Sequence, residues 1–272
     1  MVPMRAAATP MNGETRLHLC VGDPIDQVKS PEGLTRTFAE RSANAVCIPA
    51  HVRAEDFAAF VAAAKRTLNV DGFVITVPHK FSAFSHCEVA SDRARFLTAV
   101  NVMRRERNGR WRGDMTDGVA LLAALRERGF SPKGERALVI GAGGAGSAVA
   151  LALIEAGIGE LAICEVNAER REGLVRQLET LGRASVRSAP ADPSGYGLLV
   201  NATPVGMARH DPLPVEVARL DRGTFVADLI TKPAVTPLLE AAGDRGARTL
   251  TGDDMFAPQR KILADFLLGG EG

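Results

Sequence analysis

Three polar side chains in this sequence are of types that take part in ligand binding and proton transfer. Lys80 comes directly after residues 76–79 (Thr-Val-Pro-His), where a buried strand leaves its sheet through a proline. A lysine just past the carboxyl end of a strand stands where ligands bind in α/β proteins. Asn101 lies in an Ala-Val-Asn segment, and Asp117 lies in the segment 113–118. Taken singly, each has a simpler interpretation: a surface charge, a turn residue and a helix cap, respectively.

A glycine-rich turn at residues 141–146 reads Gly-Ala-Gly-Gly-Ala-Gly, between an apolar strand and a helix. This matches the G-x-G-x-x-G pattern in the strand–turn–helix setting that gives the pattern its meaning. Glycines permit a tight turn and let backbone N–H groups approach a pyrophosphate, and the helix N-terminus adds positive potential. We therefore predict a dinucleotide site. A turn with only a structural role is the alternative.

Glu165 ends the next strand after the glycine-rich turn. An acidic side chain there can accept hydrogen bonds from the ribose hydroxyls of NAD, and it would repel the 2′-phosphate of NADP. NADP-binding proteins place an arginine nearby, and Arg170 and Arg171 lie a few residues further on. The sequence favours NAD over NADP, and a solvated strand end is the other interpretation of Glu165.

Strands and helices alternate along the chain in a pattern that predicts an α/β fold with parallel sheets. Strands are expected at 17–22, 46–48, 72–78, 137–140, 161–165, 198–201, 225–228 and 249–250. Helices are expected at 31–41, 55–68, 116–128, 145–155, 170–181, 236–242 and 256–268. Asn108-Gly109 is a strong turn signal and predicts a hairpin from 99–105 and 110–112. The loop 131–134 leads into a second domain.

The chain resembles the shikimate and quinate dehydrogenase family in a series of motifs that follow the family's order over nearly the whole length. They are G-x-P…K-S-P (22–31), T-V-P-x-K (76–80), A-V-N (99–101), G-D-x-T-D-G (113–118), G-A-G-G-A (141–145), N-A-T-P-x-G-M (201–207) and a late Gly252, Met255 and Gln259.

The resemblance implies two α/β domains. An N-terminal substrate-binding domain covers 14–117 and is completed by the C-terminal helix 253–272, and an NAD(P)-binding domain of Rossmann type covers 118–252. The implied activity is the reversible oxidation of a ring hydroxyl of shikimate, quinate or a related cyclic alcohol to a ketone. Such an enzyme serves aromatic amino acid biosynthesis or the catabolism of the ring acid.

The resemblance also assigns roles to single residues. In the family, the lysine and aspartate that match Lys80 and Asp117 act as a pair on the hydroxyl being oxidised. A free lysine has a pKa of roughly 10.4 and is a poor base at pH 7. Partial burial would lower that pKa and a neighbouring carboxylate would raise it. Substrate contacts are implied for Ser30, Thr76, Asn101 and Gln259. Cofactor contacts are implied for Gly141, Gly143, Gly144, Ala145, Glu165, Asn201, Thr203, Met207 and Gly252.

Six positions depart from the family's pattern, and most of them exchange a polar group for an apolar one. They are Val28, Val74, Val102, Met115, Thr231 and Asp254. Losing one hydrogen-bond partner for a buried substrate group costs on the order of 1–3 kcal/mol. We therefore expect a changed substrate preference within the same chemistry. Lys29, Lys232, His79 or Gln27 would be able to compensate by holding a carboxylate.

Bulk composition excludes several classes of partner. Lys+Arg 33 against Asp+Glu 32 leaves a net charge of +1, which does not recruit nucleic acid or an anionic membrane. The four cysteines form no C-x-x-C pair, and the five histidines have no metal-ligand spacing, so neither a zinc site nor a disulfide framework is expected. Residues 1–13 are expected to be a loose tail without a signal peptide. The prediction is a cytoplasmic monomer or homodimer that acts on a small molecule.

Two rival interpretations remain at this point. Methylene-tetrahydrofolate dehydrogenases have a similar layout and also use a lysine, but the Thr-Asp-Gly motif and Gln259 argue against them. The second rival is a binding or regulatory relative that keeps the fold and the cofactor without turnover. Intact Lys80 and Asp117 argue against that rival.

Overall fold

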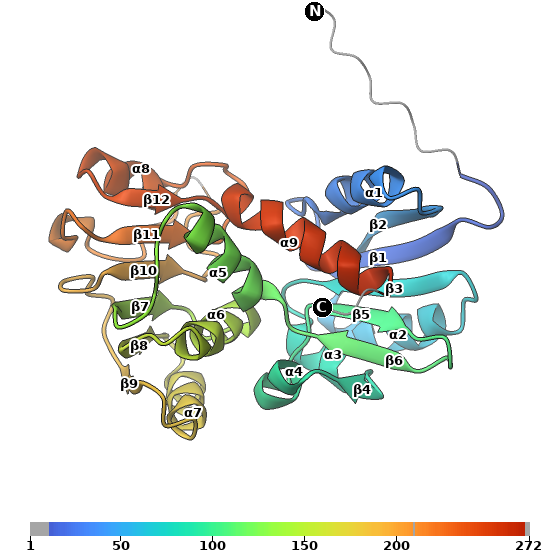
Figure 1. Cartoon of the computed structure of the whole chain (residues 1–272), viewed down its shortest axis with the longest axis horizontal. Helices are drawn as coiled ribbons and strands as arrows, with labels where there is room; N and C mark the ends of the chain where they lie inside the picture. Colours follow the sequence, from blue (N-terminus) through green and yellow to red (C-terminus); the bar gives the residue numbers. More distant parts are fainter. Residues whose placement is uncertain (1–10, 209, 270–272) are drawn as a thin grey trace, which may run out of the picture. The chain divides into compact units, whose positions relative to one another are not determined.

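The computed structural model describes residues 11–208 and 210–269, which form two compact units (Figure 1). Of the described residues, unit 1 comprises 11–91, 99–114 and 260–269. Unit 2 comprises residues 92–98 and 115–259. Most of the expected tail 1–13 and the end of the expected segment 253–272 lie outside the described residues. The expected boundaries of the substrate and cofactor domains stay a prediction.

Unit 1 is built on a mixed sheet with the strand order β2-β1-β3-β5-β6-β4. β1 pairs in parallel with β2 and β3, whereas β5 is antiparallel to β3 and β6. The expected hairpin is the pair β5–β6, and Gly109 in its turn has a φ of +83°, a conformation that favours glycine. The strands are β1 (Arg16–Gly22), β2 (Ala45–His51), β3 (Val70–Ile75), β4 (Val89–Ala90), β5 (Val102–Arg105) and β6 (Trp111–Asp114).

One apolar cluster joins the sheet of unit 1 to two of its helices, α1 (Ser30–Glu40) and the C-terminal half of α9 (Gly252–Leu267). We call it the α9 cluster. Its buried members are Cys20, Leu34, Phe38, Ala45, Cys47, Val74, Val102, Leu263, Ala264, Phe266 and Leu267, with Ile25, Val28 and Ala43 packed against them. Unit 1 also holds η1 (Ala54–Asp56), α2 (Phe57–Lys65) and α3 (Lys80–Phe84).

Unit 2 carries an all-parallel sheet with the strand order β12-β11-β10-β7-β8-β9. Its first strand is central, so the order reverses beside β7, as in doubly wound folds that bind nucleotides. The strands are β7 (Arg136–Ile140), β8 (Glu160–Cys164), β9 (Ser185–Ser188), β10 (Leu198–Asn201), β11 (Phe225–Asp228) and β12 (Arg248–Leu250). The helices are α4 (Asp92–Leu97), α5 (Asp117–Glu127), α6 (Gly144–Glu155), α7 (Ala168–Glu179), η2 (Val217–Arg219) and α8 (Pro237–Asp244), followed by the start of α9. The predicted α/β class with a Rossmann-type unit is confirmed.

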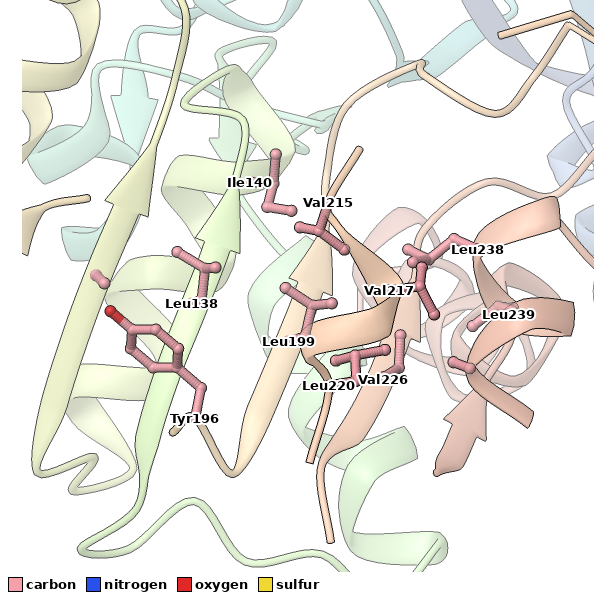
Figure 2. Close-up of a cluster of buried hydrophobic side chains, with 12 residues drawn as sticks. Leu138, Ile140, Tyr196, Leu199, Val215, Val217, Leu220, Val226, Leu238 and Leu239 are labelled. Carbon is pink, nitrogen blue, oxygen red and sulfur yellow. The ribbon is translucent and has the colours of Figure 1, made fainter. Parts of the chain in front are cut away.

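Figure 2 shows the apolar core on one face of this parallel sheet. Leu138, Leu199 and Val226 project from β7, β10 and β11, and they meet Leu238 and Leu239 of α8. Tyr196 closes one edge of the core, where its hydroxyl lies 2.7 Å from the Arg187 guanidinium. This packing fixes the ends of three strands, from which the loops of the candidate site emerge.

The start of α9 differs from its sequence-based prediction. The helix begins at Gly252 rather than at residue 256, because Thr251 and Asp254 form a reciprocal cap. The Thr251 hydroxyl accepts the Asp254 N–H at 3.1 Å, and the Asp254 carboxylate accepts the Thr251 N–H at 3.0 Å. The prediction also missed five short elements, α3, α4, β4, β9 and η2.

Among the described residues, no helix is long and apolar enough to cross a membrane. The same residues hold no group of three or more His, Cys, Asp or Glu side chains able to bind a metal ion. All four cysteines are free thiols.

Candidate active site

Lys80 is the first residue of α3 in unit 1, a few residues after β3 ends at Ile75. Its carbonyl oxygen accepts the Val100 N–H at 2.9 Å. The Ile75 N–H donates to Asn101 O at 2.7 Å, so the same segment is also held against the end of β3. Backbone hydrogen bonds therefore fix Lys80 beside the buried Asn101.

Thr76 continues this arrangement at the carboxyl edge of the sheet. Its N–H donates to Val21 O at 2.9 Å. A Cβ at Gly22 would lie 2.3 Å from the Thr76 methyl group, so the first glycine of the G-x-P segment gives Thr76 its space. Unit 1 thus brings three predicted site residues, Thr76, Lys80 and Asn101, to one edge.

His79 is buried directly before Lys80 and serves the packing of this edge. Its ring stacks on Phe57 with a centroid distance of 4.3 Å, and Nε2 donates to Val52 O at 2.8 Å. Burial lowers the pKa of His79, against opposing effects of that hydrogen bond and of Asp23. Nε2 is therefore committed to a backbone partner, and binding of a substrate carboxylate by His79 stays a prediction.

Asp117 begins α5 in unit 2 and is buried. The Gln259 side-chain amide donates to Asp117 Oδ1 at 2.7 Å, which joins two predicted site residues from α5 and α9. The next residue is Gly118, where only a glycine fits, because a Cβ there would lie 2.2 Å from Ala148 O of α6. Close packing of α5 on α6 therefore sets the position of the carboxylate.

The glycine-rich turn has the backbone that its sequence predicts. Gly141 has a φ of +97°, and a Cβ at Gly146 would lie 2.0 Å from Gly141 O. A Cβ at Gly143 would meet no atom within 4 Å, so the turn is open on that side. The turn leads into the N-terminus of α6, where backbone N–H groups suit an anion. These residues fit the pyrophosphate of a dinucleotide.

Glu165 lies beside this turn, directly after β8. Its carboxylate accepts the Ala142 N–H and the Asn167 N–H, each at 2.9 Å, and lies 3.6 Å from the Arg170 guanidinium. Burial alone would raise the pKa of Glu165, but these hydrogen bonds and Arg170 lower it on balance. A carboxylate has about four acceptor positions, so it keeps the capacity to accept ribose hydroxyls.

Asp228 supports the candidate site, and the sequence analysis treated it only as the end of a strand. It lies opposite Asn201 in the β10–β11 register and is fully buried. Its carboxylate accepts the Asn201 side-chain amide at 3.2 Å, the Ile230 N–H at 3.1 Å and the Thr236 hydroxyl at 2.7 Å. Burial raises the pKa of Asp228, and the three hydrogen bonds oppose that rise.

Asn201, which is held by Asp228, in turn forms hydrogen bonds within the loop 201–207. Its side-chain oxygen accepts the Thr203 N–H at 3.1 Å and the Thr203 hydroxyl at 2.7 Å. Its amide also donates to Val205 O at 3.1 Å. Asp228 therefore organises the loop that holds the predicted cofactor contacts Asn201, Thr203 and Met207. An acidic residue at the end of a buried strand was the available sequence signal.

Three of the four apolar departures, Val28, Val74 and Val102, lie in unit 1, and the fourth, the buried Met115, lies in unit 2. Val74 and Val102 are opposite each other in the β3–β5 register and both belong to the α9 cluster, against which Val28 packs. Ser30 borders the same cluster, because its hydroxyl hydrogen-bonds the thiol of Cys20. Asp254, by contrast, is explained by its cap on α9 and by its ion pair with Arg128 at 2.5 Å.

Comparison with known proteins agrees with this arrangement. The profile of the shikimate dehydrogenase substrate binding domain matches residues 20–103. A shikimate dehydrogenase (NADP(+)) of Lysinibacillus sphaericus is 34% identical over 92% of this chain and 91% of its own length. One of Rubrobacter xylanophilus is 38% identical over 92% of this chain and 89% of its own length. The chain belongs to the shikimate dehydrogenase family.

Solved structures of the family share the fold. A shikimate dehydrogenase in complex with NADP+ has a TM-score of 0.89 at 27% identity and covers 98% of this chain and 94% of its own. The quinate dehydrogenase of Corynebacterium glutamicum in complex with NAD has a TM-score of 0.83 at 27% identity, with 94% of each chain covered. A 5-ketofructose reductase of Gluconobacter sp. strain CHM43 has a TM-score of 0.82 at 29% identity and covers 94% of this chain and 93% of its own. The same fold is therefore found in a shikimate dehydrogenase, a quinate dehydrogenase and a 5-ketofructose reductase.

Proposed function

We propose that this protein reversibly oxidises a ring hydroxyl of shikimate, quinate or a related cyclic alcohol to a ketone, with NAD(P)+ as the hydride acceptor. The observation that carries the proposal is the set of family motifs with both Lys80 and Asp117 intact. Ser30, Thr76 and Asn101 would bind the substrate in unit 1, and Gln259 would do so beside Asp117. The glycine-rich turn, the loop 201–207 and Gly252 would bind the cofactor in unit 2.

Lys80 and Asp117 would move the hydroxyl proton in this reaction. Oxidation of a CH–OH group releases a hydride from carbon and a proton from oxygen, so a base must take the proton as the carbonyl forms. Bound NAD(P)+ supplies the hydride acceptor. The Gln259 amide donates to Asp117 Oδ1 at 2.7 Å and so orients this carboxylate. In the reverse direction, the same pair would return the proton to the alkoxide.

We infer a preference for NAD over NADP from Glu165. A charged carboxylate beside the adenosine ribose attracts its hydroxyls and repels a 2′-phosphate. Arg170 is near enough to offset this charge in part, at 3.6 Å from the carboxylate. The similar proteins of Lysinibacillus sphaericus and Rubrobacter xylanophilus are named for NADP(+), so the cofactor preference is tested directly. In Glu165→Ser, we expect the ratio of kcat/KM for NAD+ to that for NADP+ to fall roughly tenfold. An unchanged ratio would contradict this inference.

The valines of the α9 cluster favour a second candidate substrate. An uncharged polyol or ketose needs no carboxylate contacts, and the similar 5-ketofructose reductase is named for such a compound. Val28, Val74 and Val102 would then mark the loss of an acid-binding pocket.

Initial rates decide between these candidates. NAD+ and NADP+ reduction would be measured with shikimate, quinate and a panel of neutral cyclic alcohols, and NADH or NADPH oxidation with 5-ketofructose. Lys80→Ala serves as the control for site-dependent turnover. Lysine-dependent turnover of shikimate or quinate supports the proposal. Turnover of neutral compounds alone favours the second candidate, and tight binding without any redox reaction would identify a non-catalytic relative.

We expect the protein to be a monomer or a homodimer in the cytoplasm.

A further inference from the structure

Arg260 is a partly buried cation that the proposed reaction does not yet use. It lies on α9 within unit 1. Its Nε is buried without a hydrogen-bond partner, and among the described residues the structure gives its guanidinium no ion pair. A buried charged donor without a partner is costly, so such a group in a folded protein calls for a ligand or an ion.

The helix face that carries Arg260 is the one packed on the α9 cluster. Leu263, Ala264 and Leu267 follow Arg260 at spacings of three, four and seven residues, which place all four on one side of a helix. All three apolar residues belong to the α9 cluster together with Val74 and Val102. Arg260 therefore continues this face one turn toward the N-terminus of α9.

Contacts along β3 indicate which end of the sheet Arg260 approaches. The last turn of α9 lies over the beginning of β3, because a Cβ at Gly72 would be 2.5 Å from Leu267 and Phe266 O accepts the Arg104 guanidinium at 2.9 Å. Arg260 precedes Leu267 by about 10 Å of helix. Val74 lies further along β3 in the same cluster, and Thr76 follows at its carboxyl end. This order directs Arg260 toward the edge that carries Thr76 and Lys80.

Ser30 and the three valines border the same region. Val74, Val102 and the neighbouring Val28 belong to the cluster beneath Arg260, and Ser30 touches it through Cys20. These valines stand at positions where the family's pattern has polar side chains. A guanidinium presents several donors in a planar fork that matches a carboxylate. One arginine can thus replace the hydrogen bonds that several hydroxyl and amide groups would give.

We propose that Arg260, with Ser30, binds a carboxylate of the substrate and makes this protein a dehydrogenase of ring acids. The inference rests on the proposed function and refines it. It selects the acid over the neutral polyol, because a neutral substrate would leave the guanidinium without an anionic partner.

Calorimetric titration with shikimate and kinetics with shikimate and its methyl ester test this proposal. In Arg260→Gln, we expect Kd and KM for shikimate to rise roughly 10- to 100-fold, with a much smaller change for the ester. Arg260→Lys keeps the charge but loses the fork, so it should recover part of the loss. Lys261→Gln removes the same charge from an exposed neighbour on α9 and should change neither constant by more than about twofold.

The outcomes separate the two proposals. Equal losses for acid and ester in Arg260→Gln and Arg260→Lys, or a wild-type protein that binds neutral alcohols but no acid, would overturn the role of Arg260 and leave the dehydrogenase intact. Arg260-dependent binding of shikimate without any reduction of NAD+ or NADP+ would support Arg260 and overturn the proposed function. Melting temperatures of the variants exclude unfolding as the cause of a loss.

Discussion

The two units differ in how their polar site residues are supported. In unit 2, hydrogen bonds connect Asp228, Asn201 and Thr203, and these side chains also bond the neighbouring backbone. In unit 1, the corresponding edge rests on an apolar cluster that includes Val74 and Val102. The cofactor-binding unit therefore holds its site residues by polar contacts, whereas the substrate-binding unit holds them by apolar packing. With fewer polar side chains at its site, the substrate-binding unit depends on a small number of polar groups for specificity.

The largest effect is expected on the substrate side, in Lys80→Ala. Loss of a group that transfers the proton should lower kcat by roughly 10²- to 10⁴-fold. Binding of NAD(P)+ by unit 2, followed by quenching of protein fluorescence or by calorimetry, should stay within about threefold. A comparable loss of nucleotide binding would contradict the assignment of substrate chemistry to Lys80 and of nucleotide binding to unit 2.

A pH experiment on His18 tests the packing of unit 1. Burial lowers the pKa of His18 to about 4, against 6.5 for a free imidazole; Asp71 raises this pKa by a smaller amount, and Arg16 lowers it further. The unfolded chain therefore takes up the proton first as pH falls. The stability contributed by neutral His18 is complete above pH 6.5 and is lost between pH 6.5 and 4, by about 3 kcal/mol in all.

Denaturant melts of His18→Leu between pH 7 and 4 measure this contribution. The variant should show a flatter decline in stability over that range than the wild type. Exposed His210 provides the matched control, since His210→Leu should leave the slope unchanged. Asp228 in unit 2 acts in the opposite direction, because its raised pKa favours the folded state at low pH. An identical slope in His18→Leu and the wild type would contradict the assignment.

Thr236 offers a direct test of the framework in unit 2. Thr236→Val keeps the volume but removes the hydroxyl that donates to Asp228 at 2.7 Å and caps α8. We expect a loss of about 1–3 kcal/mol in stability and a rise in KM for NAD(P)+. Thr236→Ser keeps the hydroxyl and should restore most of both. If valine and serine behave alike in KM, the hydroxyl has no role in ordering the cofactor loops.

The sequence predicted those features that depend on local patterns, and it missed those that depend on register. The glycine-rich turn, the β5–β6 hairpin and the strands of unit 2 other than β9 each carry their signal within a few residues. The hydrogen bond between Asn201 and Asp228 forms only when β10 and β11 pair in parallel, so no local sequence pattern predicts it. The unpartnered Nε of Arg260 likewise depends on how α9 packs on the sheet of unit 1.

The smallest effect concerns Asp254, where a departure from the family pattern first suggested an altered pocket. The structure gives this residue a different task, because its carboxylate accepts the Thr251 N–H at 3.0 Å at the start of α9. Asp254→Ala should therefore cost about 1 kcal/mol of stability, as a lost helix cap does, without changing the preference between shikimate and its methyl ester. Asp253→Ala is the control on the same turn. A shift in substrate preference in Asp254→Ala but not in Asp253→Ala would show that Asp254 takes part in substrate specificity, and that part of this specificity comes from residues outside unit 1.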